Sequence, residues 1–471
     1  MVLNNFSPHL IHEKSVEILT EVGFCVPEDN VLSRLERLGF IVDHDHQMVR
    51  LTPEIVESAL ESLPKNVKLY DRSGETPLPF SERSSFMGAG TPVNVIDWET
   101  GVRRAANRQD VCDLVTLQDA LGQVDIVRPT VTATDQGESS DLIEIAEMLR
   151  RTSKPMVHRT LAPERVDAAA EMLFAVAGSE EAFKQRPFFA TLYCPISPGY
   201  FTPENVLCML RWAEHGIPIT LLPMTMGGAT SPATLLGELV VINTDSLAWI
   251  VVLQVLYPGI PLLYGSVSSV LDMRTGLLAL GSPERGMINS GAAVMARHYG
   301  LASMCGGFSS DAKELDAQAG FEKAITAVPL MLERAEIIYG IGAIDAGSSI
   351  SYLQMILDDD LIAGLRRMMQ GIREHDLAEE MALIKSRTPR GTFLGTKHTR
   401  RTFREHWQPA ILNRDPYETW MTKGETIEEV CRRKIQEILT QHQTPRLPAR
   451  VEAEMERVVR RHVSEEFLFE P

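Results

Sequence analysis

Short apolar runs, rich in β-branched and aromatic residues, recur through the middle of the chain. Their starts are about 29 to 44 residues apart, and they lie at 125–128, 155–158, 188–193, 217–222, 261–264, 302–305 and 337–339. Stretches with helical periodicity separate most of them, and a strand–helix unit with its loops has this length. The pattern therefore predicts a series of parallel strands, each followed by a helix.

Explicit start and stop signals support the helices. Pro at the first helical position, after a polar cap and before an acid, occurs in TPE at 202–204 and SPE at 282–284. No G-x-G-x-x-G follows the first strand, which argues against an open doubly wound sheet. We expect an α/β fold, a (β/α)8 TIM-type barrel, with its eighth strand from 381–384 or from the N-terminal region.

The two ends of the chain differ from the middle, so we expect three segments. Residues 1–107 hold two helical stretches and a hairpin with its turn at 99–101, an N-terminal α/β extension packed on the barrel. Residues 108–375 form the barrel. Residues 376–471 form a C-terminal helical extension, in which TIEE at 426–429 is a capping box.

Composition narrows the class of protein. The net charge of -17 argues against nucleic acid or an anionic membrane as partner. The apolar stretch 235–256 contains Glu238, Asn243, Asp245 and Gln254, so we expect a buried helix rather than a membrane span. Six scattered cysteines and an N-terminus without a signal-peptide pattern predict a cytoplasmic protein with no metal site.

The reaction in a parallel barrel takes place at the C-terminal ends of the strands. The loop starts there are rich in Gly, Ser, Met and aromatic residues and poor in basic ones. Tyr193, Tyr264 and Phe308 end three strands, and their rings could surround a quaternary ammonium through cation–π attraction. Packing is the competing interpretation of the same three rings.

Several polar residues have one structural and one functional interpretation. Asp345, within YGIGAIDAGSS at 339–349, is either a helix cap or a carboxylate beside a cationic ligand. Arg274 either stabilises its loop with Asp272 or binds a substrate carboxylate. His298 lies on a predicted helix, and the acidic run 358–360 is interpreted as a solvated face.

At this point the chain resembles the trimethylamine methyltransferase family of corrinoid-dependent enzymes, and specifically its non-pyrrolysine branch. The resemblance runs nearly end to end. It rests on the order and spacing of stretches such as VIDWETGVRRAANRQDV, PMTMGGATSPATLLGELVVINTD, YPGIPLLYGSVSSVLDMRTG, YGIGAIDAGSSISYLQMILDDDL and GTFLGTKHTR. The founding members contain pyrrolysine in a region similar to 339–345, where this chain has only standard residues.

The resemblance implies transfer of a methyl group from a quaternary amine to Co(I) of a separate corrinoid protein. Glycine betaine is the first expected substrate, with dimethylglycine as product. Proline betaine or a carnitine-type substrate, an unrelated barrel lyase or isomerase, and a non-catalytic betaine-binding barrel are the alternatives. A quaternary ammonium leaves as a neutral amine, so it needs orientation and a dry site rather than covalent activation.

The resemblance also assigns roles to residues. Asp345 would be the catalytic carboxylate, and Gly340 and Gly342 would keep the strand end low for the approach of the corrinoid. Arg274, His298 and Tyr352 are the candidate donors to a betaine carboxylate. We expect no tightly bound cofactor, since the cobalamin arrives on the partner, and we expect a homo-oligomer.

Overall fold

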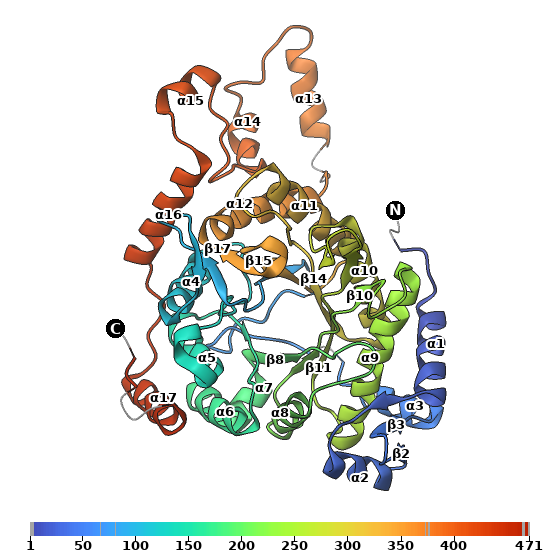
Figure 1. Cartoon of the computed structure of the whole chain (residues 1–471). Coiled ribbons are helices and arrows are strands. Elements are labelled where there is room, and N and C mark those ends of the chain that lie inside the picture. The colour runs from blue at the N-terminus through green and yellow to red at the C-terminus, as the bar shows by residue number, and fades with distance from the viewer. Residues whose placement is uncertain are drawn as a thin grey trace.

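The computed structural model describes residues 4–65, 67–80, 82–372, 374, 377–463 and 467–469. Its centre is a ring of parallel strands enclosed by a ring of helices (Figure 1). The predicted (β/α)8 architecture is confirmed, with additional segments around the outside of the helical ring.

The strands pair in the order β4-β15-β14-β11-β9-β8-β7. All pairs in this sheet are parallel, for example Tyr264 beside Ser303 and Ile338 beside Phe86. The strands are β4 (Ser85–Gly88), β7 (Met156–Val157), β8 (Phe189–Tyr193), β9 (Ile219–Leu221), β11 (Leu262–Ser266), β14 (Ala302–Gly306) and β15 (Ile337–Ile341).

Residues 126–127 complete the ring. Ile126 bridges to Met87 of β4, and Val127 bridges to Met156 of β7, both in parallel orientation. The run predicted at 125–128 is therefore a very short barrel strand. The remaining strand, β4, comes from the N-terminal region, whereas 381–384 lies in a helix.

Alternate residues of each strand face opposite sides of the barrel wall. The barrel interior contains one buried apolar cluster, to which successive strands contribute Met87, Ile126, Val157, Leu192, Leu222, Leu263, Met304 and Ile337. Their sequence neighbours, such as Phe86, Tyr193, Tyr264 and Ile338, belong to a larger cluster between the strands and the helices. This alternation decides which side chains reach the mouth of the barrel.

The helices of the outer ring begin at the signals expected from sequence. Ser282 caps α10 by accepting from the backbone N–H of Arg285, and Thr202 caps α8 in the same way. The ring comprises α4 (Arg108–Ala120), α5 (Ser140–Arg151), α6 (Pro163–Ala177), α8 (Pro203–Glu214), α9 (Leu235–Leu256), α10 (Pro283–Tyr299), α11 (Ala317–Leu332) and α12 (Tyr352–Met369). A short helix, α7 (Glu180–Gln185), precedes β8, and a 3-10 segment, η1 (Thr134–Ser139), precedes α5.

Helix α9 is long and apolar enough to span a membrane by composition, yet 83% of its most apolar window is buried inside the protein. It packs between the barrel and the N-terminal helices (Figure 1). Tyr264 donates a hydrogen bond to Asn243 Oδ1 of this helix at 3.0 Å. The prediction of a buried helix at 235–256 is confirmed.

The N-terminal extension consists of α1 (Pro8–Glu21), α2 (Asp29–Arg37) and α3 (Pro53–Glu61), with a small antiparallel sheet of β1 (Phe24–Cys25), β3 (Met48–Arg50) and β2 (Ile41–Asp43). Helix α1 packs on α9 and α10. The predicted hairpin is β5 (Asn94–Ile96) and β6 (Arg103–Ala105), joined by β17 (Ser349–Ser351) and β16 (Ala343–Ile344) in a second small sheet.

The C-terminal extension has two parts. Helices α16 (Ile427–Gln441) and α17 (Ala449–His462) pack on the barrel helices α4, α12, α5 and α6, and Thr426 and Glu429 form the predicted capping box. Between the barrel and α16, helices α13 (Leu377–Arg387), α14 (Lys397–Thr402) and α15 (Tyr417–Lys423), with η3 (Phe403–Glu405), project beyond the helical ring (Figure 1). We call this segment, residues 377–423, the arm.

Candidate active site

Side chains at the strand ends face the mouth of the barrel. Arg128, Arg159, Cys194 and Tyr339 each lie two positions after an interior residue of their strand, namely Ile126, Val157, Leu192 and Ile337. Tyr339 and Cys194 pack against the interior cluster. The mouth of the barrel is therefore polar and partly aromatic above an apolar floor.

Arg128 and Tyr339 are in direct contact. The Arg128 guanidinium carbon lies 5.3 Å from the centre of the Tyr339 ring, a cation–π distance. Arg128 is only 3% exposed, and burial lowers the pKa of its guanidinium, with Arg159 nearby acting in the same direction. The glycine at 90 makes room for the ring, since a Cβ there would lie 2.4 Å from the Tyr339 hydroxyl.

Arg285 reaches the mouth from helix α10. Its Nη1 donates to the carbonyl of Val267 at 2.8 Å, directly after β11. A Cβ at Gly306 would lie 2.5 Å from Arg285 Nη2, so the absent side chain at the end of β14 leaves space for this guanidinium. Burial lowers the pKa of Arg285 to about 10, and Tyr339 is among the groups that oppose this shift.

A buried acid–imidazole pair lies behind the arginines, between the wall and α5. His158 Nε2 is 2.8 Å from Glu144 Oε2, and Glu144 Oε1 accepts from the backbone N–H of Ala133 at 2.9 Å. Burial raises the pKa of Glu144 to about 8 and lowers the pKa of His158 to about 3. Near neutral pH the carboxyl group is therefore protonated and the imidazole is neutral, so the pair carries no net charge.

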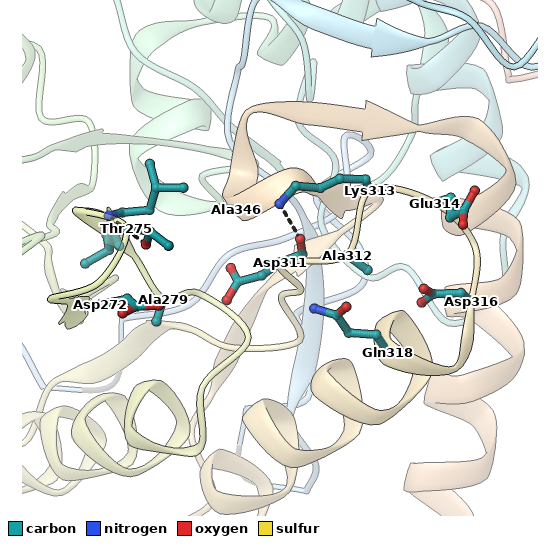
Figure 2. A pocket seen from close by; sticks show the side chains of 12 residues that line it. Asp272, Thr275, Ala279, Asp311, Ala312, Lys313, Glu314, Asp316, Gln318 and Ala346 are labelled. Atoms are coloured by element: carbon teal, nitrogen blue, oxygen red, sulfur yellow. Dashed lines mark hydrogen bonds between the residues drawn. The ribbon is translucent and has the colours of Figure 1, made fainter.

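An open cavity of about 400 Å³ lies on the same face (Figure 2). Its walls are the hairpin of β12 (Ser269–Asp272) and β13 (Leu277–Leu278), the loop after β14 and residue Ala346. Four acids, Asp272, Asp311, Glu314 and Asp316, line it together with Lys313, whose ammonium donates to the carbonyl of Asp311 at 2.6 Å. The rim of the mouth is thus acidic on this side.

Asp345 lies beside this cavity, at the start of the 3-10 segment η2 (Asp345–Gly347). Its carboxylate is 3.3 Å from Lys313 Nζ and 3.6 Å from Arg103 Nη2. Its backbone is in the left-handed region, with φ of 54°, and its N–H donates to the carbonyl of Ala312. Two cations of the chain itself therefore flank the residue predicted to be catalytic.

The structure does not bring the three predicted cage rings together at the mouth. Tyr193 and Tyr264 face outward, where Tyr193 donates to the Thr160 carbonyl at 3.2 Å. Phe308 is fully buried against Phe86, with ring centres 5.6 Å apart, and Lys323 Nζ lies 4.7 Å from its centre. All three pack in the layer between strands and helices.

The three predicted carboxylate donors also lie apart from one another. The Arg274 side chain is 89% exposed and pairs with Asp272 in the β12–β13 hairpin. This contact agrees with the interpretation of Arg274 as a residue that stabilises its loop. His298 lies near the C-terminal end of α10, with its ring centre 5.9 Å from that of His12. Tyr352 is buried at the start of α12 and donates to Asp110 Oδ1 at 2.9 Å.

The glycines of β15 have close neighbours from their own chain. A Cβ at Gly340 would lie 2.2 Å from the Gly307 carbonyl oxygen and 2.6 Å from that of Phe308, and the pairing of β15 with β4 shifts at this point. Gly342 has a φ of 82°, in the left-handed region. Close packing of the loop after β14 thus requires glycine at 340.

The interpretation of the acidic run 358–360 as a solvated face is wrong. Asp358 is fully buried and pairs with the fully buried Lys323 at 2.7 Å. It also accepts from the Gly342 N–H at 2.8 Å. Asp360 accepts the backbone N–H groups of Ala410, Ile411 and Leu412, and Asp359 accepts that of Gln123.

The fold and the polar mouth define a (β/α)8-barrel protein of the kind that places its active site at the C-terminal ends of its strands. The profile of the family described as "Trimethylamine methyltransferase (MTTB)" matches residues 2–466. The chain belongs to this family, and its class is that of a methyltransferase.

Named relatives align along nearly the whole chain. Trimethylamine methyltransferase MttB of Desulfitobacterium hafniense (strain DSM 10664 / DCB-2) is 31% identical over 456 residues, covering 96% of this chain and 92% of the relative. Glycine betaine methyltransferase of Desulfitobacterium hafniense (strain Y51) is 29% identical over 455 residues, covering 95% and 94%. The monomethylamine methyltransferase structure from Methanosarcina barkeri covers 92% of each chain at a TM-score of 0.49 and 10% identity.

Proposed function

We propose that the protein transfers a methyl group from a quaternary amine, with glycine betaine first, to Co(I) of a separate corrinoid protein, leaving dimethylglycine. The observation that carries this proposal is the composition of the mouth. The mouth contains an inward-facing aromatic ring, that of Tyr339, in contact with a buried guanidinium, and all of its residues are standard ones. Family membership supplies the methyl-transfer chemistry.

A quaternary ammonium suits such a mouth. When its carbon–nitrogen bond breaks, the electron pair remains on nitrogen and the product leaves as a neutral amine, so no proton and no covalent activator are needed. The protein then has to hold the cation in line and exclude water. Tyr339 presents an aromatic ring for the ammonium, and the interior cluster closes the floor beneath it.

The rim of the mouth fits a protein partner that brings the corrinoid. Large apolar side chains are exposed on loops that follow the barrel strands, at Leu161, Ile196, Met224, Met273 and Leu277, with exposed fractions of 44% to 69%. Exposed apolar groups around a site are typical of a surface that docks another protein. The corrinoid would be carried by the partner protein, and its cobalt would accept the methyl group when the partner docks on the rim.

Proline betaine or a carnitine-type substrate is the alternative within the same chemistry, and a non-catalytic betaine-binding barrel is the alternative outside it. The 29% identity to a glycine betaine methyltransferase and the 31% identity to a trimethylamine methyltransferase do not separate these substrates. Size separates the three betaines, since a larger betaine needs a wider mouth, and the carboxylate separates all three from trimethylamine.

We also propose a homo-oligomer that assembles through the arm. Its helices bury no side chain of their own, and large apolar residues are exposed along it, including Leu377, Phe393, Leu394, Tyr417, Trp420 and Met421. The arm lies outside the helical ring (Figure 1), away from a partner seated over the mouth, so a second copy of the chain is the occupant that we assign to it.

The six cysteines are free thiols, which suits a reducing cytoplasm. We place the protein there, in anaerobic one-carbon and methylamine metabolism.

Methylation of Co(I) cobalamin by the purified protein tests the proposed reaction. Glycine betaine, proline betaine, carnitine, trimethylamine and dimethylglycine serve as donors, and the amine product is quantified by mass spectrometry. We expect one equivalent of dimethylglycine per methyl group transferred from glycine betaine. Transfer from trimethylamine with none from any quaternary amine would overturn the proposal, and tight betaine binding without transfer to any corrinoid acceptor would establish the binding-protein alternative.

A further inference from the structure

Three arginines converge on the mouth of the barrel from different elements. Arg128 follows the short strand at 126–127, Arg159 follows β7, and Arg285 reaches in from α10 through the space at Gly306. Arg128 lies 5.3 Å from the Tyr339 ring centre, Gly306 beside Arg285 pairs in register with Tyr339, and Val127 bridges to Met156 of the strand that Arg159 follows. The three guanidiniums therefore surround one region at the strand ends.

Their positive charge is not balanced by the chain. Within the described ranges, no carboxylate lies within ion-pair distance of Arg128, Arg159 or Arg285, although many other arginines on this protein have such a partner. Glu144, whose pKa is influenced by Arg128 and Arg159, lies beside His158 behind the wall. Because its pKa is raised by burial, it contributes little negative charge near neutral pH.

Two of these guanidiniums are also incompletely hydrogen bonded. Arg128 and Arg285 are 3% and 1% exposed, and the Nε of each has no hydrogen-bond partner in the described structure. A buried charge without an opposite charge is strongly unfavourable, and an anionic ligand would supply the missing charge here. The fork of a guanidinium matches the two oxygens of a carboxylate.

We propose that Arg128, Arg159 and Arg285 form a carboxylate-binding subsite that selects quaternary amines bearing a carboxylate. This inference rests on the proposed function and names its substrate class. The subsite holds the anionic end of the substrate at the strand ends, beside Tyr339. Uncarboxylated cations such as choline or tetramethylammonium are disfavoured, because the same three positive charges repel them.

Calorimetric titration of the free protein, with no corrinoid present, tests the subsite independently of methyl transfer. Glycine betaine, proline betaine and carnitine are compared with choline and tetramethylammonium. We expect choline to bind at least about 30-fold more weakly than the best carboxylated amine, since unpaired buried guanidiniums would remain. Equal affinities for carboxylated and uncarboxylated amines, or no binding of any carboxylated amine, would overturn the proposal.

Substitutions locate the effect. Arg128→Gln and Arg285→Gln should each reduce the preference for the carboxylated amine over choline to less than about 3-fold, and Arg128→Lys should keep part of it. Arg297→Gln is the matched control, because that half-exposed arginine lies on the same helix as Arg285, pairs with Glu333 and should leave the preference unchanged. A preference that persists in folded Arg128→Gln and Arg285→Gln proteins, verified by circular dichroism, would contradict the assignment.

The subsite and the proposed reaction can fail separately. If carboxylate-dependent binding is found but no methyl group reaches cobalt, the subsite stands and the reaction fails. If choline and trimethylamine donate methyl groups as well as glycine betaine does, the reaction stands and the subsite fails.

Discussion

Tyr339 and Phe308 lie on opposite sides of the barrel wall, which gives the two rings separable roles. Tyr339 is half-buried at the mouth beside Arg128, whereas Phe308 is buried against Phe86. We expect Tyr339→Leu to weaken binding of the quaternary amine by about 0.5 to 2 kcal/mol, through loss of the ring face. We expect Phe308→Ala to lower the free energy of unfolding by about 3 to 5 kcal/mol.

Calorimetric titration and urea denaturation of both variants measure these effects, with each variant as the control for the other. If affinity for the quaternary amine falls in folded Phe308→Ala protein and not in Tyr339→Leu protein, then Phe308 contacts the substrate and Tyr339 does not.

The alternation of side chains along the strands explains which site residues could be predicted. Sequence identified the strand ends correctly, and counting by twos from Ile126, Val157 and Ile337 leads to Arg128, Arg159 and Tyr339. Hydrophobicity cannot say which alternate set points inward, because both faces of a barrel wall are buried. Leu192 and Tyr193 are both buried, yet only Leu192 faces the interior.

At the scale of elements, the Lys323–Asp358 pair joins α11, β15 and α12 in the layer between the strands and the helices. Lys323 donates to Asp358 at 2.7 Å and to the carbonyls of Phe308 and Gly340, and Asp358 accepts from the Gly342 N–H. We expect Lys323→Met to lower the free energy of unfolding by about 3 to 5 kcal/mol, because Asp358 would remain buried without its partner.

Urea denaturation checks this expectation, with Lys313→Met as the matched control. Lys313 is 64% exposed and pairs with Asp345 on the rim, so its replacement should change stability by about 0.5 kcal/mol or less. The double variant Lys323→Met with Asp358→Leu should recover part of the loss. A decrease below about 1 kcal/mol for Lys323→Met alone would show that the pair does not hold these elements together.

Local patterns predicted the elements well and their pairing poorly. The capping signals and the strand–helix spacing predicted the barrel, since both depend on residues that are close in sequence. The burial of Asp358 depends on Lys323, which lies on a preceding helix, and three successive acids give no local sign of such a partner. The strand β4 could not be located from local sequence either, because it is short and its neighbour in the sheet, β15, lies far away in sequence.

At the scale of the whole molecule, the arm determines how copies of the chain meet in the assembly that we propose. Leu394 is 82% exposed and Met421 is 57% exposed. We expect the full chain to be oligomeric by light scattering, and Leu394→Asp with Met421→Asp to reduce its mass toward that of one chain, because charge opposes burial of an apolar contact. Lys385→Asp, another charge change on the arm, is the control for a general electrostatic effect. A monomeric wild-type chain would contradict the assignment.

The pairing of β4 with β15 has a consequence for biosynthesis. Ser85–Gly88 leaves the ribosome long before Ile337–Ile341, so the sheet stays open during most of translation, with β4 unpaired at one of its two edges. Exposed strand edges can pair with other chains. A messenger truncated before codon 337 would encode a fragment without β15, which cannot close the barrel. Such fragments should depend on chaperones to remain dispersed.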